Sequence, residues 1–238
     1  MTKKAIIIIM ILLFNYAPHT QADNLNDDVI DSSALIFDEL DNYEINKKNG
    51  PLQIFTVKGQ LKAEGKVKNS LKEGEWIIYF EDSDKKNIAA KGIYKADFRH
   101  GQWNFYHPNG KIKSKITFIN GEINGIYYEF SDKGVPLAEI TFRNSLKNGT
   151  YRIYYPNGIP KAILMYSKDK KNGTENLYYP NGKRSSIGQY KNGTKDGLWK
   201  YNYETGKRKS AGYYRNNKKT GKWKIYDENE KIINIENY

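Results

Sequence analysis

The strongest restriction on the fold of this chain is a glycine that returns every 24 residues through most of its length. The interval is kept in every unit except the second, which is three residues longer near residues 81–87. A fixed period of this length predicts a repeat architecture in which each unit contacts only its neighbours, rather than a globular domain around one centre. The repeat glycines are Gly50, Gly74, Gly101, Gly125, Gly149, Gly173, Gly197 and Gly221.

Each unit has the pattern of a β-hairpin when its residues are numbered from that glycine. Positions 2–7 are aromatic and β-branched, positions 8–10 form a turn such as Pro108-Asn109-Gly110, and positions 11–18 alternate between two faces. Helical periodicity does not occur in the repeats. Because a single hairpin is marginal in water, the units must stack on one another. We predict an all-β fold, an elongated antiparallel repeat ribbon of about eight 24-residue β-hairpin units.

Aromatic residues recur at positions 3, 6 and 18 of the units, and tryptophan occupies position 3 in four of them. Position 16 is glycine in four units, which leaves space beside these columns for rings from adjacent units. We therefore interpret the repeat glycines and the tryptophans as structural. The residues concerned are Trp76, Trp103, Trp199 and Trp223 at position 3, and Gly65, Gly92, Gly188 and Gly212 at position 16.

Three segments are expected along the chain. Residues 1–22 have the charged start and short apolar core of a signal peptide, with cleavage after Ala22, and the alternative is an uncleaved anchor. Residues 23–42 are an acidic leader or cap, with a short helix or strand at residues 31–40. Residues 43–238 are the repeat domain, in which Tyr43 ends a degenerate preceding unit. The chain is therefore expected to be exported, either periplasmic or secreted.

Charge is distributed unevenly between the leader and the repeats. Residues 23–49 carry eight acids and two lysines, whereas residues 50–238 carry 35 Lys/Arg and 19 Asp/Glu, a net charge of +16. A basic body attracts acidic proteins, acidic glycans and phosphates, although lysine also keeps sheets soluble and their edges unpaired. The chain has no cysteine, which excludes disulfides, thiolate metal sites and a cysteine nucleophile.

The repeat pattern resembles that of a known family. The pattern G-x-[WY]-x-x-Y-x-x-x-G, then seven residues and an aromatic, as in Gly197–Trp223, is similar to the MORN-repeat variant, and the resemblance covers about residues 43–238. It implies a sheet of repeated hairpins. Bacterial proteins of this type include YwqK-like antitoxins of toxin–antitoxin systems, and other MORN proteins are scaffolds or associate with membrane lipids. The resemblance brings no catalytic residue.

Two columns are candidates for ligand binding. Tyrosine occupies position 7 in three consecutive units, and if it shares the face of position 3 it forms a ladder suited to stacking on sugars or in a protein groove. Lysine occupies position 11 in four units. The competing interpretation is a packed stripe with a solvated rim. The candidates are Tyr155, Tyr179 and Tyr203 in the first column, and Lys111, Lys183, Lys207 and Lys231 in the second.

The pattern carries no recognisable catalytic or metal site. His100 and His107 lack acidic partners at a fixed spacing, so we expect no metal and no cofactor. We predict a non-enzymatic, exported scaffold for a protein partner, with antitoxin-like or immunity-like neutralisation of a toxin as one form of that role. The alternative is a binding module for acidic cell-envelope polysaccharide or lipid. Nucleic acid is not expected as a partner, and the oligomeric state stays open.

Overall fold

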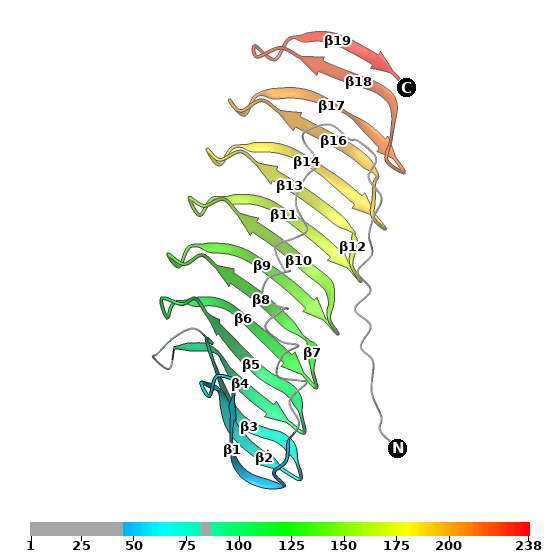
Figure 1. The fold of residues 1–238 in the computed structure, drawn as a ribbon. Helices are drawn as coiled ribbons and strands as arrows, with labels where there is room; N and C mark the ends of the chain where they lie inside the picture. The colour runs from blue at the N-terminus through cyan, green and yellow to red at the C-terminus, as the bar shows by residue number, and fades with distance from the viewer. Residues whose placement is uncertain (1–44, 82–86) are drawn as a thin grey trace.

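The protein forms one antiparallel sheet of 19 strands, in which hairpins stack from β1 at one end to β19 at the other (Figure 1). The computed structural model describes residues 45–81 and 87–238. The predicted all-β repeat ribbon is confirmed. The predicted signal peptide, acidic leader, short helix and Tyr43 lie outside the described residues. Among those that are described, no helix is long and apolar enough to span a bilayer.

The strands form eight hairpins, and consecutive hairpins pair antiparallel along the ribbon. Short strands β7 (Glu122–Ile123), β12 (Lys170–Lys171) and β15 (Thr194–Lys195) precede β8, β13 and β16. The hairpins are β1 (Asn49–Phe55) with β2 (Leu61–Lys68), β3 (Leu71–Tyr79) with β4 (Ile88–Lys95), β5 (Phe98–Tyr106) with β6 (Ile112–Ile119), β8 (Gly125–Phe130) with β9 (Pro136–Arg143), β10 (Leu146–Tyr154) with β11 (Pro160–Ser167), β13 (Gly173–Tyr178) with β14 (Arg184–Lys191), β16 (Gly197–Asn202) with β17 (Arg208–Arg215), and β18 (Lys218–Tyr226) with β19 (Ile232–Asn237).

The two faces of the sheet differ because side chains alternate along each strand. In β5, Trp103 and Phe105 are buried while Gln102 is exposed and Asn104 is half-buried. Positions 3, 5, 14, 16 and 18 share the buried side, which we call the aromatic face. Positions 2, 4, 15 and 17 lie on the opposite side, which we call the open face.

The turns at both edges use backbone conformations that the sequence allows. Gly110 closes the turn after β5 with a φ of +80°, and its amide donates to the carbonyl of His107 at 2.8 Å. At the opposite edge Asn144 and Ser145 have φ values of +50° and +61°. Two consecutive residues with positive φ give a type I′ geometry, whose twist matches that of the flanking strands.

Tryptophan of one unit packs directly over glycine of the preceding unit. Trp199 is fully buried, and a Cβ atom on Gly188 would overlap its indole ring. The indole Nε1 also donates to the Gln189 carbonyl at 3.2 Å. The other pairs are Gly65 with Trp76, Gly92 with Trp103 and Gly212 with Trp223. The space predicted beside position 16 is therefore filled by the tryptophan of the next unit.

Where position 16 is large, the next unit places a smaller residue at position 3. Ile116 and Ile140 precede units with Tyr127 and Tyr151, and the unit after Leu164 has glutamate in place of tryptophan. These six side chains are at most 4% exposed. A larger side chain at position 16 is thus accompanied by a smaller one at position 3, as close packing of an interior requires.

Candidate binding surfaces

The tyrosine column lies at the edge of the sheet, in the turns. Tyr155, Tyr179 and Tyr203 directly follow the last residues of β10, β13 and β16. The prediction that position 7 belongs to the strand and shares the face of position 3 is therefore wrong. The cause is a break in register between positions 5 and 6, after which the position 7 amide closes the turn.

The tyrosine hydroxyls connect consecutive units. Tyr155 donates to the Tyr178 carbonyl at 2.8 Å, and Tyr179 donates to the Asn202 carbonyl at 2.7 Å. Tyr203 continues the series with the Tyr226 carbonyl at 2.8 Å. Burial raises the pKa values of Tyr155 and Tyr179 above the usual range. These hydroxyls hold neighbouring turns together, so only the half-buried rings remain for a ligand.

Other side chains join the same turns in the same way. His107 occupies position 7 of its unit, and its Nε2 lies 2.9 Å from the Phe130 carbonyl oxygen. The turn asparagines donate from Nδ2 to a carbonyl of the next turn. These contacts are Asn109 to Asp132 at 2.9 Å, Asn157 to Pro180 at 3.0 Å and Asn181 to Glu204 at 3.0 Å. His107 thus replaces tyrosine structurally.

The four lysines of the second column are exposed in four separate turns of that edge, and the turns of Lys183, Lys207 and Lys231 are consecutive. Lys183 donates from Nζ to the Thr205 carbonyl at 2.8 Å, and Lys111 donates to the Lys133 carbonyl at 3.3 Å. Lys207 and Lys231 accept turn-closing bonds through their backbone carbonyls. The structure brings the tyrosine and lysine columns to one edge of the ribbon, and it does not converge them into a pocket.

A further set of cations, the cation row, lies against the aromatic face, and the sequence interpretation missed it. Lys195 Nζ is 4.5 Å from the ring centroid of Trp199, and Lys219 Nζ is 4.7 Å from that of Trp223. In the sequence, each member of the cation row is a basic residue two positions before the repeat glycine. A cation over a ring face is stabilised by the quadrupole of the ring. The row comprises Lys72, Arg99, Lys147, Lys171, Lys195 and Lys219.

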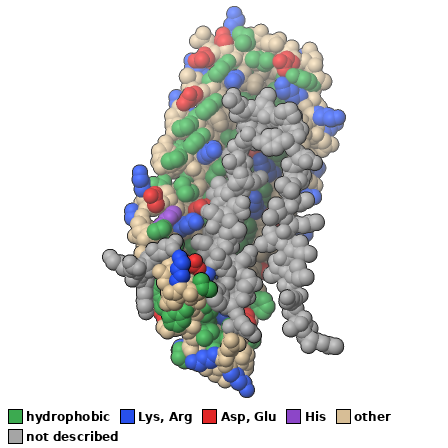
Figure 2. Space-filling view, viewed as in Figure 1, with side chains coloured by type: hydrophobic (Ala, Val, Ile, Leu, Met, Phe, Trp, Pro, Cys, Tyr) green, Lys and Arg blue, Asp and Glu red, His purple; other side chains and the backbone are tan. Residues whose placement is uncertain are grey.

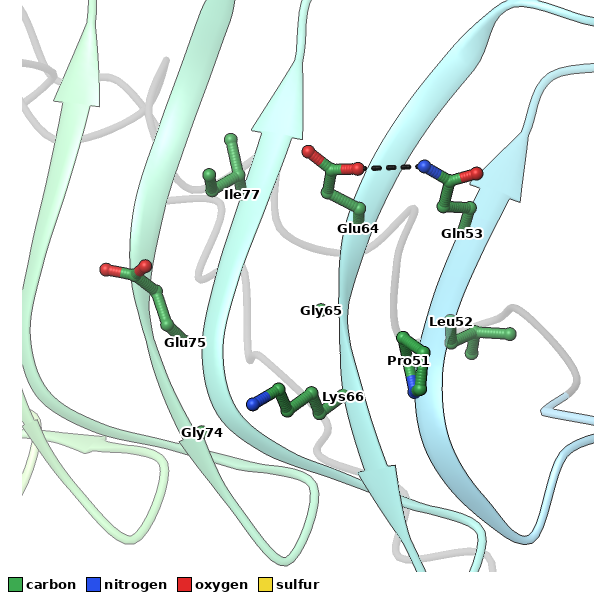
Figure 3. A pocket seen from close by; sticks show the side chains of 9 residues that line it. All are labelled: Pro51, Leu52, Gln53, Glu64, Gly65, Lys66, Gly74, Glu75 and Ile77. Carbon is green, nitrogen blue, oxygen red and sulfur yellow. Dashed lines mark hydrogen bonds between the residues drawn. The ribbon is translucent and has the colours of Figure 1, made fainter.

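A hollow of about 580 Å³ lies on the open face over β1–β3 (Figure 3). Its acids already have partners. Glu64 accepts hydrogen bonds from Gln53 at 2.9 Å and from Tyr79 at 2.6 Å. Burial, together with the bond to Glu64, raises the pKa of Tyr79 to about 12. Glu75 pairs with Lys91 at 2.8 Å. Such an arrangement stabilises the first hairpins and presents no unpaired carboxylate for proton transfer.

Two acids lie on the aromatic face at positions that are hydrophobic in most units. Glu175 replaces tryptophan and pairs with Lys171 at 3.4 Å. Glu129 is buried, and this burial raises its pKa above the usual range. Neither acid lines one of the hollows described on the open face. Among residues 45–81 and 87–238, no group of three His, Cys, Asp or Glu side chains is arranged to hold a metal.

A single line of side chains, the central row, crosses the open face at positions 4 and 15. Each member is the register partner of the next across neighbouring strands. In the first half of the row, charged side chains of both signs are interspersed with uncharged ones. Within it, Arg152 pairs with Glu139 at 2.9 Å. The second half, from Ile163 onward, has two lysines and no acid. The row runs Gln53, Glu64, Ile77, Lys91, Asn104, Lys115, Tyr128, Glu139, Arg152, Ile163, Asn176, Ile187, Lys200, Ala211, Lys224, Ile235.

Comparison with protein families gives a match for part of the repeat domain. A family model described as the MORN repeat variant matches residues 99–120, 147–168, 171–192, 195–216 and 219–238. Five repeats of the chain match the MORN repeat variant. Each match begins at a member of the cation row. Hairpins β1–β2, β3–β4 and β8–β9 are unmatched, and β8–β9 has Ile123 at the position of the cation. No curated protein matches the chain.

Proposed function

We propose that this MORN-repeat chain is a non-catalytic interaction scaffold that holds a protein partner along its sheet. The observation that carries the proposal is the open face, which extends across all eight hairpins and is crossed by one continuous row of half-buried and exposed side chains. Repeat sheets offer extended surfaces of this kind for recognition. Figure 2 shows rows of hydrophobic side chains over the sheet and basic side chains along its margins.

We further propose that the chain acts outside the cytoplasm, in an antitoxin-like or immunity-like role against a protein toxin. Support for export comes from residues 1–22, whose charged start and short apolar core are typical of a signal peptide. Support for neutralisation is the resemblance to bacterial repeat proteins of antitoxin type. An exported copy would meet its toxin in the periplasm or beyond the cell, so immunity is the form consistent with both arguments.

The test is affinity capture of partners from the native envelope with the chain lacking residues 1–22. We expect a defined protein that is retained by the native chain and lost after substitution of central-row residues. The matched control is Lys58→Glu, an exposed turn residue remote from the second half of the row. Capture of no protein from the envelope or from candidate toxins would refute the scaffold role.

A second candidate function is binding of acidic envelope polysaccharide or lipid. The net charge of +16 over residues 50–238 favours it, since a strongly basic surface concentrates polyanions. Retention on isolated envelope would then fall steeply as salt is raised. Protease treatment of the envelope distinguishes the two functions, because it removes a protein partner and leaves a glycan or lipid in place.

A further inference from the structure

The second half of the open face contains two adjoining hollows over β13, β14, β16 and β17. Their volumes are about 310 Å³ and about 240 Å³, and both are lined by Ile187 and Lys200. Lys200 and Leu198 flank Trp199 in β16. Because neighbouring side chains on a strand point to opposite faces, the hollows lie on the side opposite the buried tryptophan. Together they form a groove that crosses several strands.

The cations of this groove lack partners within the described part of the chain. Arg184 and Lys200 make no side-chain hydrogen bond or ion pair there, and Arg208 only approaches the Tyr226 ring at 5.7 Å. The one acid among the lining residues is Glu230, in the last hairpin turn. In contrast, the acids of the hollow over β1–β3 are paired. Adjacent like charges repel one another, so a bound anion would stabilise this groove.

The floor of the groove is apolar. Leu198 is 39% exposed, and Ile187 lies half-buried between Asn176 and Lys200 in the central row. Exposed aliphatic side chains between unpaired cations favour a ligand that carries both carboxylates and apolar groups. An acidic polypeptide meets this requirement better than a polysaccharide, whose repeating units lack aliphatic side chains.

The spacing of the cations also fits an extended peptide. Arg184 in β14 and Arg208 in β17 occupy the same position of consecutive units, and β16 lies between these strands, so the two arginines are two strands apart. That separation is about 10 Å, since strands lie about 4.8 Å apart. An extended peptide of the polyproline II type has three residues per turn and rises about 3.1 Å per residue, so carboxylates on every third residue share one edge and are separated by a similar distance, about 9 Å.

We propose that this groove docks an extended acidic segment of the protein partner. The carboxylates of that segment pair with Arg184, Lys200 and Arg208, and its apolar side chains rest on Ile187 and Leu198. The inference rests on the proposed scaffold function and adds the chemistry and the place of recognition. The occupant is recognised by acids about three residues apart, with apolar residues between them.

The probe for this proposal is a synthetic peptide of Glu-Val-Thr units about nine residues long, which spans roughly 30 Å when extended. Its control is the same peptide with glutamine in place of glutamate. Binding to the full chain is measured by fluorescence anisotropy at low and moderate salt. We expect saturable, salt-sensitive binding of the acidic peptide, with the glutamine peptide bound at least tenfold more weakly.

Three variants locate the binding site. Lys200→Glu and Arg184→Glu are each expected to weaken peptide binding about tenfold, while Lys58→Glu, which changes the net charge equally, has little effect. Leu198→Ser is expected to weaken binding severalfold through the apolar floor. Denaturation midpoints confirm that the variants stay folded. An equal loss with Lys58→Glu would show attraction by net charge alone and overturn the proposal.

Other occupants have distinct outcomes in the same assay. Binding to phosphatidylglycerol vesicles that requires Lys200, without peptide binding, would reassign the groove to an anionic membrane surface. Tighter binding of a peptide of residues 23–44 would reassign it to the acidic leader of this chain. Capture of a partner that survives both Lys200→Glu and Arg184→Glu would overturn the groove proposal and leave the scaffold function standing.

Discussion

Replacement of Gly188 by alanine tests the central packing claim, because the expected sign is the opposite of the usual one. Gly188 has no positive φ, and at such positions Gly→Ala ordinarily stabilises a protein by about 0.4–1 kcal/mol through the unfolded state. Here the added Cβ would overlap the indole of Trp199, where nonbonded carbon atoms need about 3.5–4.0 Å. The ring must therefore move away from β14.

The magnitude follows from three contributions. Overpacking of a tight interior costs about 1–3 kcal/mol. Displacement of the indole also loses the Nε1 bond to the Gln189 carbonyl, at 3.2 Å, which is worth about 1 kcal/mol. The unfolded-state gain offsets part of this loss. We expect Gly188→Ala to lower the free energy of unfolding by about 2 kcal/mol, with Gln189→Ala as the control that changes it by less than about 0.5 kcal/mol.

Urea denaturation followed by tryptophan fluorescence measures the change, and amide hydrogen exchange locates it. Because each hairpin contacts only its neighbours, protection should fall first in β16–β19, beyond the damaged interface. The double variant Gly188→Ile with Trp199→Tyr copies the Ile140–Tyr151 pair, so the two changes should compensate by about 1 kcal/mol or more. Unchanged or increased stability of Gly188→Ala, or simple additivity in the double variant, would refute the packing argument.

Four other predictions concern single groups. Tyr179→Phe removes the hydroxyl bond to the Asn202 carbonyl, and should cost about 1 kcal/mol in urea denaturation. Lys195→Gln removes the cation over Trp199, and should cost about 0.5–2 kcal/mol, an effect that high salt does not reproduce. Tyr79 has its pKa raised from 10.0 to about 12 by burial and by Glu64, so its contribution is complete below pH 10 and is lost as pH rises through about 12. A tyrosinate titration of Tyr79→Phe should therefore lack the highest-pH step. If the proposed export is correct, N-terminal sequencing of the protein from its native cells should begin at Asp23, and a start at Met1 would instead indicate an uncleaved anchor.

Much of the fold was predictable from the sequence because each unit repeats the same pattern of turn and strand residues. Turn glycines and asparagines and alternating aromatic strands are recognised from neighbouring residues, so the hairpin order and the two main strands of each unit followed directly. The short strands β7, β12 and β15 were not predicted. The packing of Trp199 against Gly188 was also predicted in general form. A glycine beside an aromatic column leaves space, and a ring from an adjacent unit was expected to fill it.

The candidate site was less predictable. The tyrosines were expected on a strand face, and a register break moved Tyr155, Tyr179 and Tyr203 into the turns. One shifted residue changes which side of a sheet a side chain occupies, and the alternating pattern alone does not reveal where the shift occurs. The bonds of their hydroxyls to the next turn join residues 23 positions apart, which only the stacked arrangement brings together.

The 24-residue period, read from the sequence alone, was sufficient to establish a ribbon of stacked hairpins, because local turn and strand preferences act within each unit. The partners of Lys195 and the continuity of the row from Ile163 to Ile235 required the folded sheet. Whether a lysine covers a ring or faces a groove depends on the register between strands. That register is set by packing between units, so the sequence of one unit alone does not determine it.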